Sequence, residues 1–215
     1  MADDCLPQVH AFRMRVAVLG ADGVPLPGAE NLYTTNALTT LTLGTEVADA
    51  TEIEERNGGD DICVAYQGDP SLKWGTVGIE LCTPDPYLEA ILSGGKIIDL
   101  GGSVPAGFAY PAIGPLRSNG FSIEVWARRI NAGDVDPDYP YAWWALPKIK
   151  RSKLGERELG NSAQKPKYEA LAYENTNWYD GPLNDWPGSS DRFAQWGPTA
   201  SVPDAVCGPT ALVAS

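Results

Sequence analysis

Hydrophobic and polar side chains alternate with a period of two in several parts of this chain, which is the pattern of half-buried β-strands. The runs cover residues 12–19, 38–43, 62–66, 72–82, 121–130 and 168–175. In the run at 72–82, Val77, Ile79 and Leu81 fall on one face. Thr76 and Glu80 fall on the opposite face. The apolar face of such a strand requires a second layer of structure to cover it.

One short helix is predicted at residues 86–93. Asp85 can cap the free amides of its first turn, Pro86 suits the first helical position, and Gly94 can end the helix. Apolar side chains three and four positions apart would form one stripe that covers the mouth or flank of the sheets. The residues of this stripe are Tyr87, Ala90 and Ile91.

Glycine and proline interrupt the chain throughout, with 23 and 18 residues, and no apolar stretch has the length and period of a long helix. We therefore expect a mainly β protein. A chain of 215 residues is long enough for one large core, so we expect a single domain over 1–215, with an N-terminal arm at 1–11 and a C-terminal segment at 197–215. We expect neither a membrane span nor a secretion signal, because no apolar run is long enough and residues 1–10 include acids and a proline.

The residues that usually carry chemistry form no recognisable set. Cys5, Cys63, Cys82 and Cys207 lack the close spacing of zinc ligands and are expected to be free, mostly buried thiols. The single histidine, His10, falls in the N-terminal arm, which argues against a Ser-His or Cys-His nucleophile pair. We expect no catalytic site, no metal and no cofactor, although a carboxylate pair of the glycosidase type stays open among the 28 acidic residues.

Charge is segregated into two connections. Residues 44–61 contain seven acidic residues and one basic residue, whereas residues 148–167 contain seven basic and two acidic residues. Such loops would suit repeated copies of the chain, in which the acidic loop of one copy meets the basic loop of the next. The alternative is two solvated loops that never meet. The candidate contact residues are Glu46, Asp49, Glu52, Glu54, Glu55, Lys148, Lys150, Arg151, Lys153 and Arg157.

Several stretches follow one another in an order that is similar to that of a known family. They are NGGD at 57–60, the strand at 77–82 that runs into TPDP and stops at two glycines, PYAWWALP at 140–147, and YEN at 173–175, which leads through Trp178 to DGP at 180–182 and DW at 185–186. This order resembles the major tail tube protein of long, non-contractile phage tails, particularly those of phages that infect actinobacteria.

The resemblance implies a structural virion protein. Its fold would be a sandwich or barrel of two packed antiparallel sheets with one short flanking helix and long loops, without an extra immunoglobulin-like domain. Copies would form rings, expected to be hexameric, that stack into a tube, and acidic side chains would line the conduit so that DNA passes without stable binding. The net charge of -12 fits such repulsion of DNA. The candidates for the lumen-facing positions are Thr76, Glu80 and Glu124.

The resemblance also implies a location and partners. The protein would be made in the cytoplasm of the host bacterium and would reside in the virion tail, where it contacts copies of itself, the tape measure, the tail terminator and distal tail proteins. Two alternatives stay open. A tail terminator or tail-completion protein would form a single ring, and a non-viral carbohydrate-binding β-sandwich or glycosidase would use aromatic residues such as Trp143 and Trp186.

Overall fold

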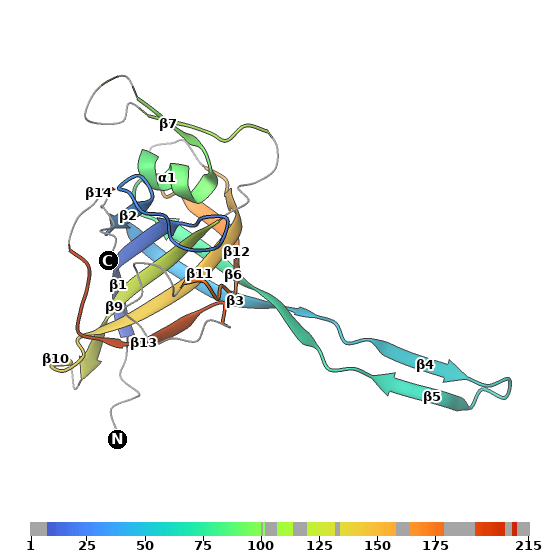
Figure 1. The fold of residues 1–215 in the computed structure, drawn as a ribbon. Coiled ribbons are helices and arrows are strands. Elements are labelled where there is room, and N and C mark those ends of the chain that lie inside the picture. The colour runs from blue at the N-terminus through green and yellow to red at the C-terminus, as the bar shows by residue number, and fades with distance from the viewer. Residues whose placement is uncertain are drawn as a thin grey trace.

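The structure is a computed structural model that describes residues 8–99, 101, 107–113, 120–131, 134–157, 164–178, 192–204 and 208–209. Figure 1 shows a β-rich body with one α-helix and one long hairpin that projects from it. The elements are β1 (Gln8–Val18), β2 (Leu32–Thr35), β3 (Leu38–Ala48), β4 (Glu52–Arg56), β5 (Ile62–Gln67), β6 (Ser71–Leu81), α1 (Pro86–Ser93), β7 (Lys96–Ile98), β8 (Gly107–Ala109), β9 (Phe121–Asn131), β10 (Asp134–Val135), β11 (Tyr141–Leu154), β12 (Lys167–Tyr173), β13 (Gln195–Thr199) and β14 (Gly208–Pro209).

One antiparallel sheet runs through the body in the order β14-β2-β1-β9-β11-β12-β6-β3, with β10 paired to β9 and β13 paired to β11. The long strand β11 divides this path. Its residues 141–145 pair with β13 and β9, whereas its residues 148–154 pair with β12. Pro147 lies between these two parts, where the register with β9 shifts. The path therefore has two halves. The first half is β14-β2-β1-β9 with the start of β11, and the second half is the end of β11 with β12, β6 and β3.

The main hydrophobic core lies between these two halves. Its fully buried side chains include Met14 of β1, Ile123 of β9, Ile79 of β6 and Tyr168 of β12. Val77, Ile79 and Leu81 all lie in this core, as the alternation predicted. Because both halves contribute to one cluster, the arrangement is that of a β-sandwich, and the predicted mainly β fold with one short flanking helix is confirmed.

A second hydrophobic cluster covers the other face of the first half. Trp178, which follows β12, is completely buried and stacks on Trp143 of β11, with ring centroids 6.3 Å apart. The side chain of Asn175 fixes this segment because its amide donates to the carbonyl oxygens of Gly23 and Pro147, at 2.8 and 3.0 Å. β9 and β11 are consequently buried on both faces, a feature that their alternating sequences do not predict.

Helix α1 has the predicted bounds and caps. The Asp85 carboxylate accepts hydrogen bonds from the amides of Tyr87 and Leu88, and Gly94 has the left-handed conformation, with φ of 78°, that ends the helix. The predicted apolar stripe is wrong in part. Ile91 is buried, but Leu88 and Leu92 complete the buried face, and Tyr87 and Ala90 lie half-buried at its border. Within the described residues, no helix has the length and apolar character needed to cross a membrane.

Several predicted segment boundaries are wrong. Residues 8–11 of the predicted N-terminal arm belong to β1 and pair with β9, so His10 lies in a strand. The predicted acidic loop at 44–61 holds the end of β3 and all of β4, and the predicted basic loop at 148–167 starts with the second half of β11. Long-range strand pairing extends these elements past the local alternation. Cys63 and Cys82 are free but exposed, whereas Cys5 and Cys207 lie outside the described residues, as does much of the predicted C-terminal segment.

Candidate assembly surfaces

The most exposed feature of the molecule is the projecting hairpin, which we define as residues 47–72 (Figure 1). Its outer strands β4 and β5 pair only with each other among the described strands. The predicted tight turn at its tip is confirmed. The Asn57 side-chain oxygen accepts from the amides of Gly59 and Asp61, at 2.8 and 3.0 Å, and Asp60 adopts a left-handed φ of 66°.

The projecting hairpin has one mainly apolar face, which also carries Glu55, and one acidic face. Residues directly opposite each other share a face, and Ile53 pairs with Tyr66 while Glu55 pairs with Val64. The side chains of Ile53, Val64 and Tyr66 are 45%, 46% and 59% exposed. The opposite face carries Glu52 and Glu54, and Arg56 forms an ion pair with Glu54 at 2.7 Å.

At the root of the hairpin, the apolar face of the sheet continues past the end of the core. Leu43 of β3 pairs with the buried Val77, and four residues further along the same strand Val47 pairs with Leu72. Val47 and Leu72 are each about half exposed because they lie beyond the end of the core. β6 has one more residue than β3 in this region. It is Lys73, which has no partner in the register of β3 against β6 and forms a β-bulge. The sheet therefore extends past the material that covers its apolar side.

The hairpin also carries a concentrated negative charge. Residues 47–72 include seven acidic residues and one basic residue, a net charge of -6 out of -12 for the chain. Of the predicted acidic contact residues, Asp49, Glu52, Glu54 and Glu55 lie on it, and Glu46 lies at its root on β3. All five side chains are exposed.

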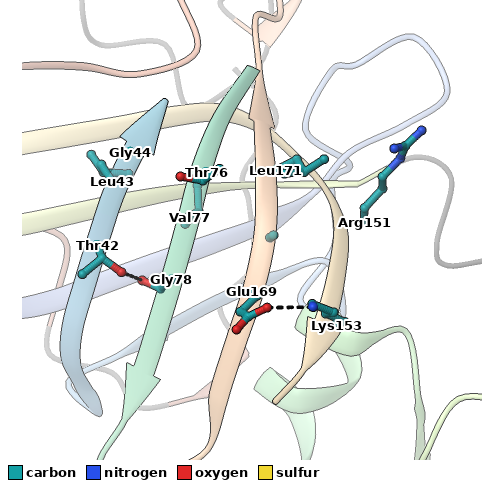
Figure 2. A pocket seen from close by; sticks show the side chains of 11 residues that line it. Thr42, Leu43, Gly44, Thr76, Val77, Gly78, Arg151, Lys153, Glu169 and Leu171 are labelled. Atoms are coloured by element: carbon teal, nitrogen blue, oxygen red, sulfur yellow. Dashed lines mark hydrogen bonds and ion pairs between the residues drawn. The ribbon is translucent and has the colours of Figure 1, made fainter. Parts of the chain in front are cut away.

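The outward face of the second half of the sheet forms a shallow groove of about 720 Å³ across β3, β6 and β12 (Figure 2). Gly44 and Gly78 have no side chain, which leaves room for the hydroxyls of Thr76 and Thr42 on the floor of the groove. The hydroxyl of Thr42 donates a hydrogen bond to the carbonyl oxygen of Gly78 at 3.2 Å. The ion pair between Lys153 and Glu169, at 2.7 Å, borders the groove. Arg151 also lines the groove, at the side where β11 lies (Figure 2).

The predicted lumen-facing residues do not share one exposed surface. Thr76 and Glu80 lie half-buried on the outward face of β6, and Glu80 forms an ion pair with Lys167 at 3.4 Å. The prediction that Glu124 faces a lumen is wrong, because this residue is only 2% exposed. Its carboxylate binds Arg15 at 2.6 Å and accepts from the indole nitrogen of Trp143 at 2.9 Å, so it cannot face an open conduit.

Charge on this outward face differs from the expected acidic lining. The strand registers place three carboxylates and four ammonium groups on it. They are Glu46, Glu80, Glu169, Lys148, Lys150, Lys153 and Lys167. A conduit lined by this face would be nearly neutral, so the acidic lining expected from Glu80 and Glu124 is not present here.

The predicted basic contact residues lie mostly on the last part of β11. Arg151 occupies a bulge with a left-handed φ of 55°, which exposes its side chain. Burial and the charge of Lys150 lower the pKa of Lys148 below its usual value. Lys148 and Lys150 are thus crowded cations without an ion-pair partner among the described residues.

Arg157, one of the predicted contact residues between subunits, is engaged within its own subunit. Its guanidinium binds the buried Glu89 of α1 at 2.7 Å and lies 5.8 Å from the centre of the Tyr110 ring. Burial opposes the charged form of Arg157, but the hydrogen bond and charge of Glu89 outweigh it and raise the pKa of Arg157. The pair therefore fastens the end of β11 to α1.

The acidic and basic residues predicted to attract each other do not meet within one subunit. No ion pair in the described part of the chain joins the two sets. Strands β12 and β6 separate Glu46 on β3 from the cations on β11. The apolar face of the hairpin was missed at the sequence level, although the alternation at Ile62, Val64 and Tyr66 contains the signal.

Two strand edges are open in the second half of the sheet. β3 pairs only with β6 among the described strands, and residues 150–154 of β11 pair only with β12. Open edges carry unpaired amides and carbonyls that favour pairing with another chain. One edge holds Glu46, whereas the other holds Lys150, Arg151 and Lys153.

The aromatic platform of the carbohydrate-binding alternative is not formed by Trp143. This side chain is 5% exposed and lies in the second hydrophobic cluster, whereas Trp186 lies outside the described residues. A scan against protein-family models and a search of curated proteins found no match to this chain.

Proposed function

We propose that this chain is a structural virion subunit that polymerises, as stacked hexameric rings, into the tail tube through which phage DNA is ejected. The observation that carries the proposal is the projecting hairpin, whose apolar side chains Ile53, Val64 and Tyr66 are about half exposed and whose strands pair only with each other among the described strands. Apolar surface of this kind on a protruding element favours association with another chain. A second copy is the partner always present at high concentration during assembly.

The two open edges support the ring. Antiparallel or parallel pairing of β3 of one copy with residues 150–154 of β11 of the next would extend the four-stranded half into a closed sheet and remove both edges. The acidic residue at one edge and the three cations at the other would then favour this neighbour over a pairing of like edges. In such a ring the outward face with Thr76 and Glu80 lines the conduit, and its balanced charge would hold DNA only weakly.

Electron microscopy of the purified protein tests the proposal. We expect hollow tubes or stacked rings from the full chain. The variant Ile53→Ser/Val64→Ser/Tyr66→Ser removes the apolar face and should abolish tubes, while the melting temperature of the subunit stays unchanged because these side chains lie outside the core. The matched control Glu52→Gln/Glu54→Gln alters the other face of the same strands and should still form tubes.

Other outcomes discriminate between the candidate functions. Single rings that never stack would identify a terminator or completion ring instead of a tube subunit. A strictly monomeric protein at all concentrations would contradict the proposal, as would tubes that form normally from the variant without the apolar face.

A further inference from the structure

We infer that the projecting hairpin of one copy docks on the α1 end of another copy, so that subunits associate head to tail along the tube. This inference rests on the proposed function, and it names the surface that receives the hairpin. The receiving surface, called here the α1-end surface, consists of strands β7 and β8, residues 110–113, and the adjoining ends of β11 and β12.

The hairpin and the α1-end surface lie at opposite ends of the same strand. β6 begins at Ser71, where the projecting hairpin ends, and it finishes at Leu81, four residues before the cap of α1. An 11-residue strand spans about 35 Å, so the two surfaces are too far apart to meet in one subunit. Figure 1 shows the hairpin leaving the body on the side away from α1 and β7. A contact between two such ends is heterologous, and it builds an open filament when successive copies do not close into a ring.

The α1-end surface offers exposed apolar side chains to the apolar face of the hairpin. Ile113 is fully exposed, and Ile98 and Tyr110 are about half exposed. The Phe108 ring of β8 packs against Gly95 at the end of α1 and against the Tyr110 ring, with the two ring centroids 5.4 Å apart.

The same end of the molecule carries cations that can face the acidic hairpin. Lys96 and Lys165 have no ion-pair partner among the described residues, whereas Lys153, Arg157 and Lys167 each form an ion pair within the subunit. An open basin of about 1130 Å³ there is lined by four cationic and three anionic side chains. Its charged lining residues are Lys153, Arg157, Lys165, Lys167, Glu80, Glu156 and Glu169. Arg157 connects this basin to the apolar surface through its contact with Tyr110. Lys96 is a further exposed cation on β7, and Asp99 is the one carboxylate close to it in the chain.

The other exposed apolar patch of the body is a poor receptor for the hairpin. It comprises Val135 and Tyr139 near β10, and its neighbours Asp134 and Asp138 are exposed carboxylates. The nearby Arg129 is already paired with Asp136 at 3.3 Å. Since the hairpin carries a net charge of -6, like-charge repulsion disfavours this patch.

Disulfide trapping between two differently labelled chains tests the inference. In a background with all four cysteines changed to serine, one chain carries Val64→Cys and the other carries Ile113→Cys. After mild oxidation of the mixture we expect a covalent dimer of the two chains. The control partner with Val135→Cys in place of Ile113→Cys should give little of this product, although both side chains are exposed.

A second measurement does not depend on disulfide geometry. Ile113→Glu places a carboxylate where the acidic hairpin would dock, and it should raise the critical concentration for assembly by about tenfold or more. Val135→Glu makes the same chemical change at the other patch and should leave that concentration unchanged. Because both side chains are exposed, neither substitution should alter the melting temperature.

The outcomes separate the inference from the proposed function. Tubes that form equally well with Ile113→Glu, together with trapping only through Val135→Cys, would overturn the inference and leave the tube function standing. Specific trapping through Ile113→Cys without any tubes would uphold the head-to-tail contact and contradict the tube function.

Discussion

Glu124 lies on the strand face that the alternation predicts, but that face is buried and not exposed to solvent. Its position in β9 places it on the face opposite Ile123 and Val125, as alternation predicts, but the segment that contains Trp178 covers that face as well. The carboxylate is left with two polar partners, Arg15 and the Trp143 indole. Burial of this ion pair depends on residues about 50 positions further along the chain, so no local pattern contains it.

Glu124→Ala should destabilise the protein by about 3–5 kcal/mol, because removing one partner leaves the Arg15 charge poorly solvated. Chemical denaturation of the two proteins measures this difference. Glu169→Ala is the control, since its pair with Lys153 is about two-thirds exposed on both sides and should change stability by about 0–1 kcal/mol. Equal effects of the two substitutions would show that the Glu124 pair is not buried in solution.

Tyr168 should make the protein sensitive to alkaline pH. Burial and then the charge of Glu89 raise the pKa of its phenol, and together they outweigh the opposing charge and hydrogen bond of Arg157. A pKa that is higher in the folded state means that the contribution to stability is complete below the unfolded pKa of about 10 and is lost as pH rises beyond it. Tyr168→Phe cannot ionise, so its free energy of unfolding should fall less steeply above about pH 10. Urea denaturation across the alkaline range compares the two slopes, and parallel curves would contradict the assignment.

At the scale of elements, α1 could be predicted to the residue, whereas the long strands could not. The limits of the helix are set by contacts within the segment itself, from Asp85 at its start to Gly94 at its end. Strand limits depend on partners far away in the sequence. β3 continues to Ala48 because β6 pairs with it, and β11 continues to Leu154 because β12 pairs with it. Residues that look like charged loops are therefore strands.

Asp85→Ala should destabilise the protein by more than the loss of a helix cap alone, which costs about 1 kcal/mol. The same carboxylate also accepts a hydrogen bond from the Tyr33 hydroxyl, so the substitution leaves two sets of donors without their acceptor. We expect about 2 kcal/mol, measured by thermal or chemical unfolding. Asp85→Ser can still cap the helix, and Tyr33→Phe removes only the second contact. If Asp85→Ala cost no more than Asp85→Ser, the double role of this side chain would be refuted.

For the whole molecule, the sequence contains the components of the assembly surfaces but not their arrangement. The charge of the two segments and the tight turn at Asn57 are local and could be read directly. That the acidic segment projects from the body, and that Val47 and Leu72 at its root continue the core face of β3, follow from the pairing of β3 with β6. The balanced charge of the outward face likewise depends on strand register, which places Lys167 opposite Glu80.

Reversing the charge of the β11 edge tests whether electrostatic attraction between copies contributes to assembly. Lys150→Glu/Arg151→Glu would place two carboxylates beside the strand that faces Glu46 of the neighbouring β3 in the proposed ring. Repulsion should raise the critical concentration for assembly at low salt, as followed by sedimentation. Because salt screens exposed charges over about 10 Å at 0.1 M, the difference from the natural protein should shrink as salt is added. Lys73→Glu/Arg128→Glu changes the net charge equally at exposed positions away from this edge, and it should assemble like the natural protein. A defect of the same size in both double variants would mean that net charge, and not the β11 edge, governs assembly.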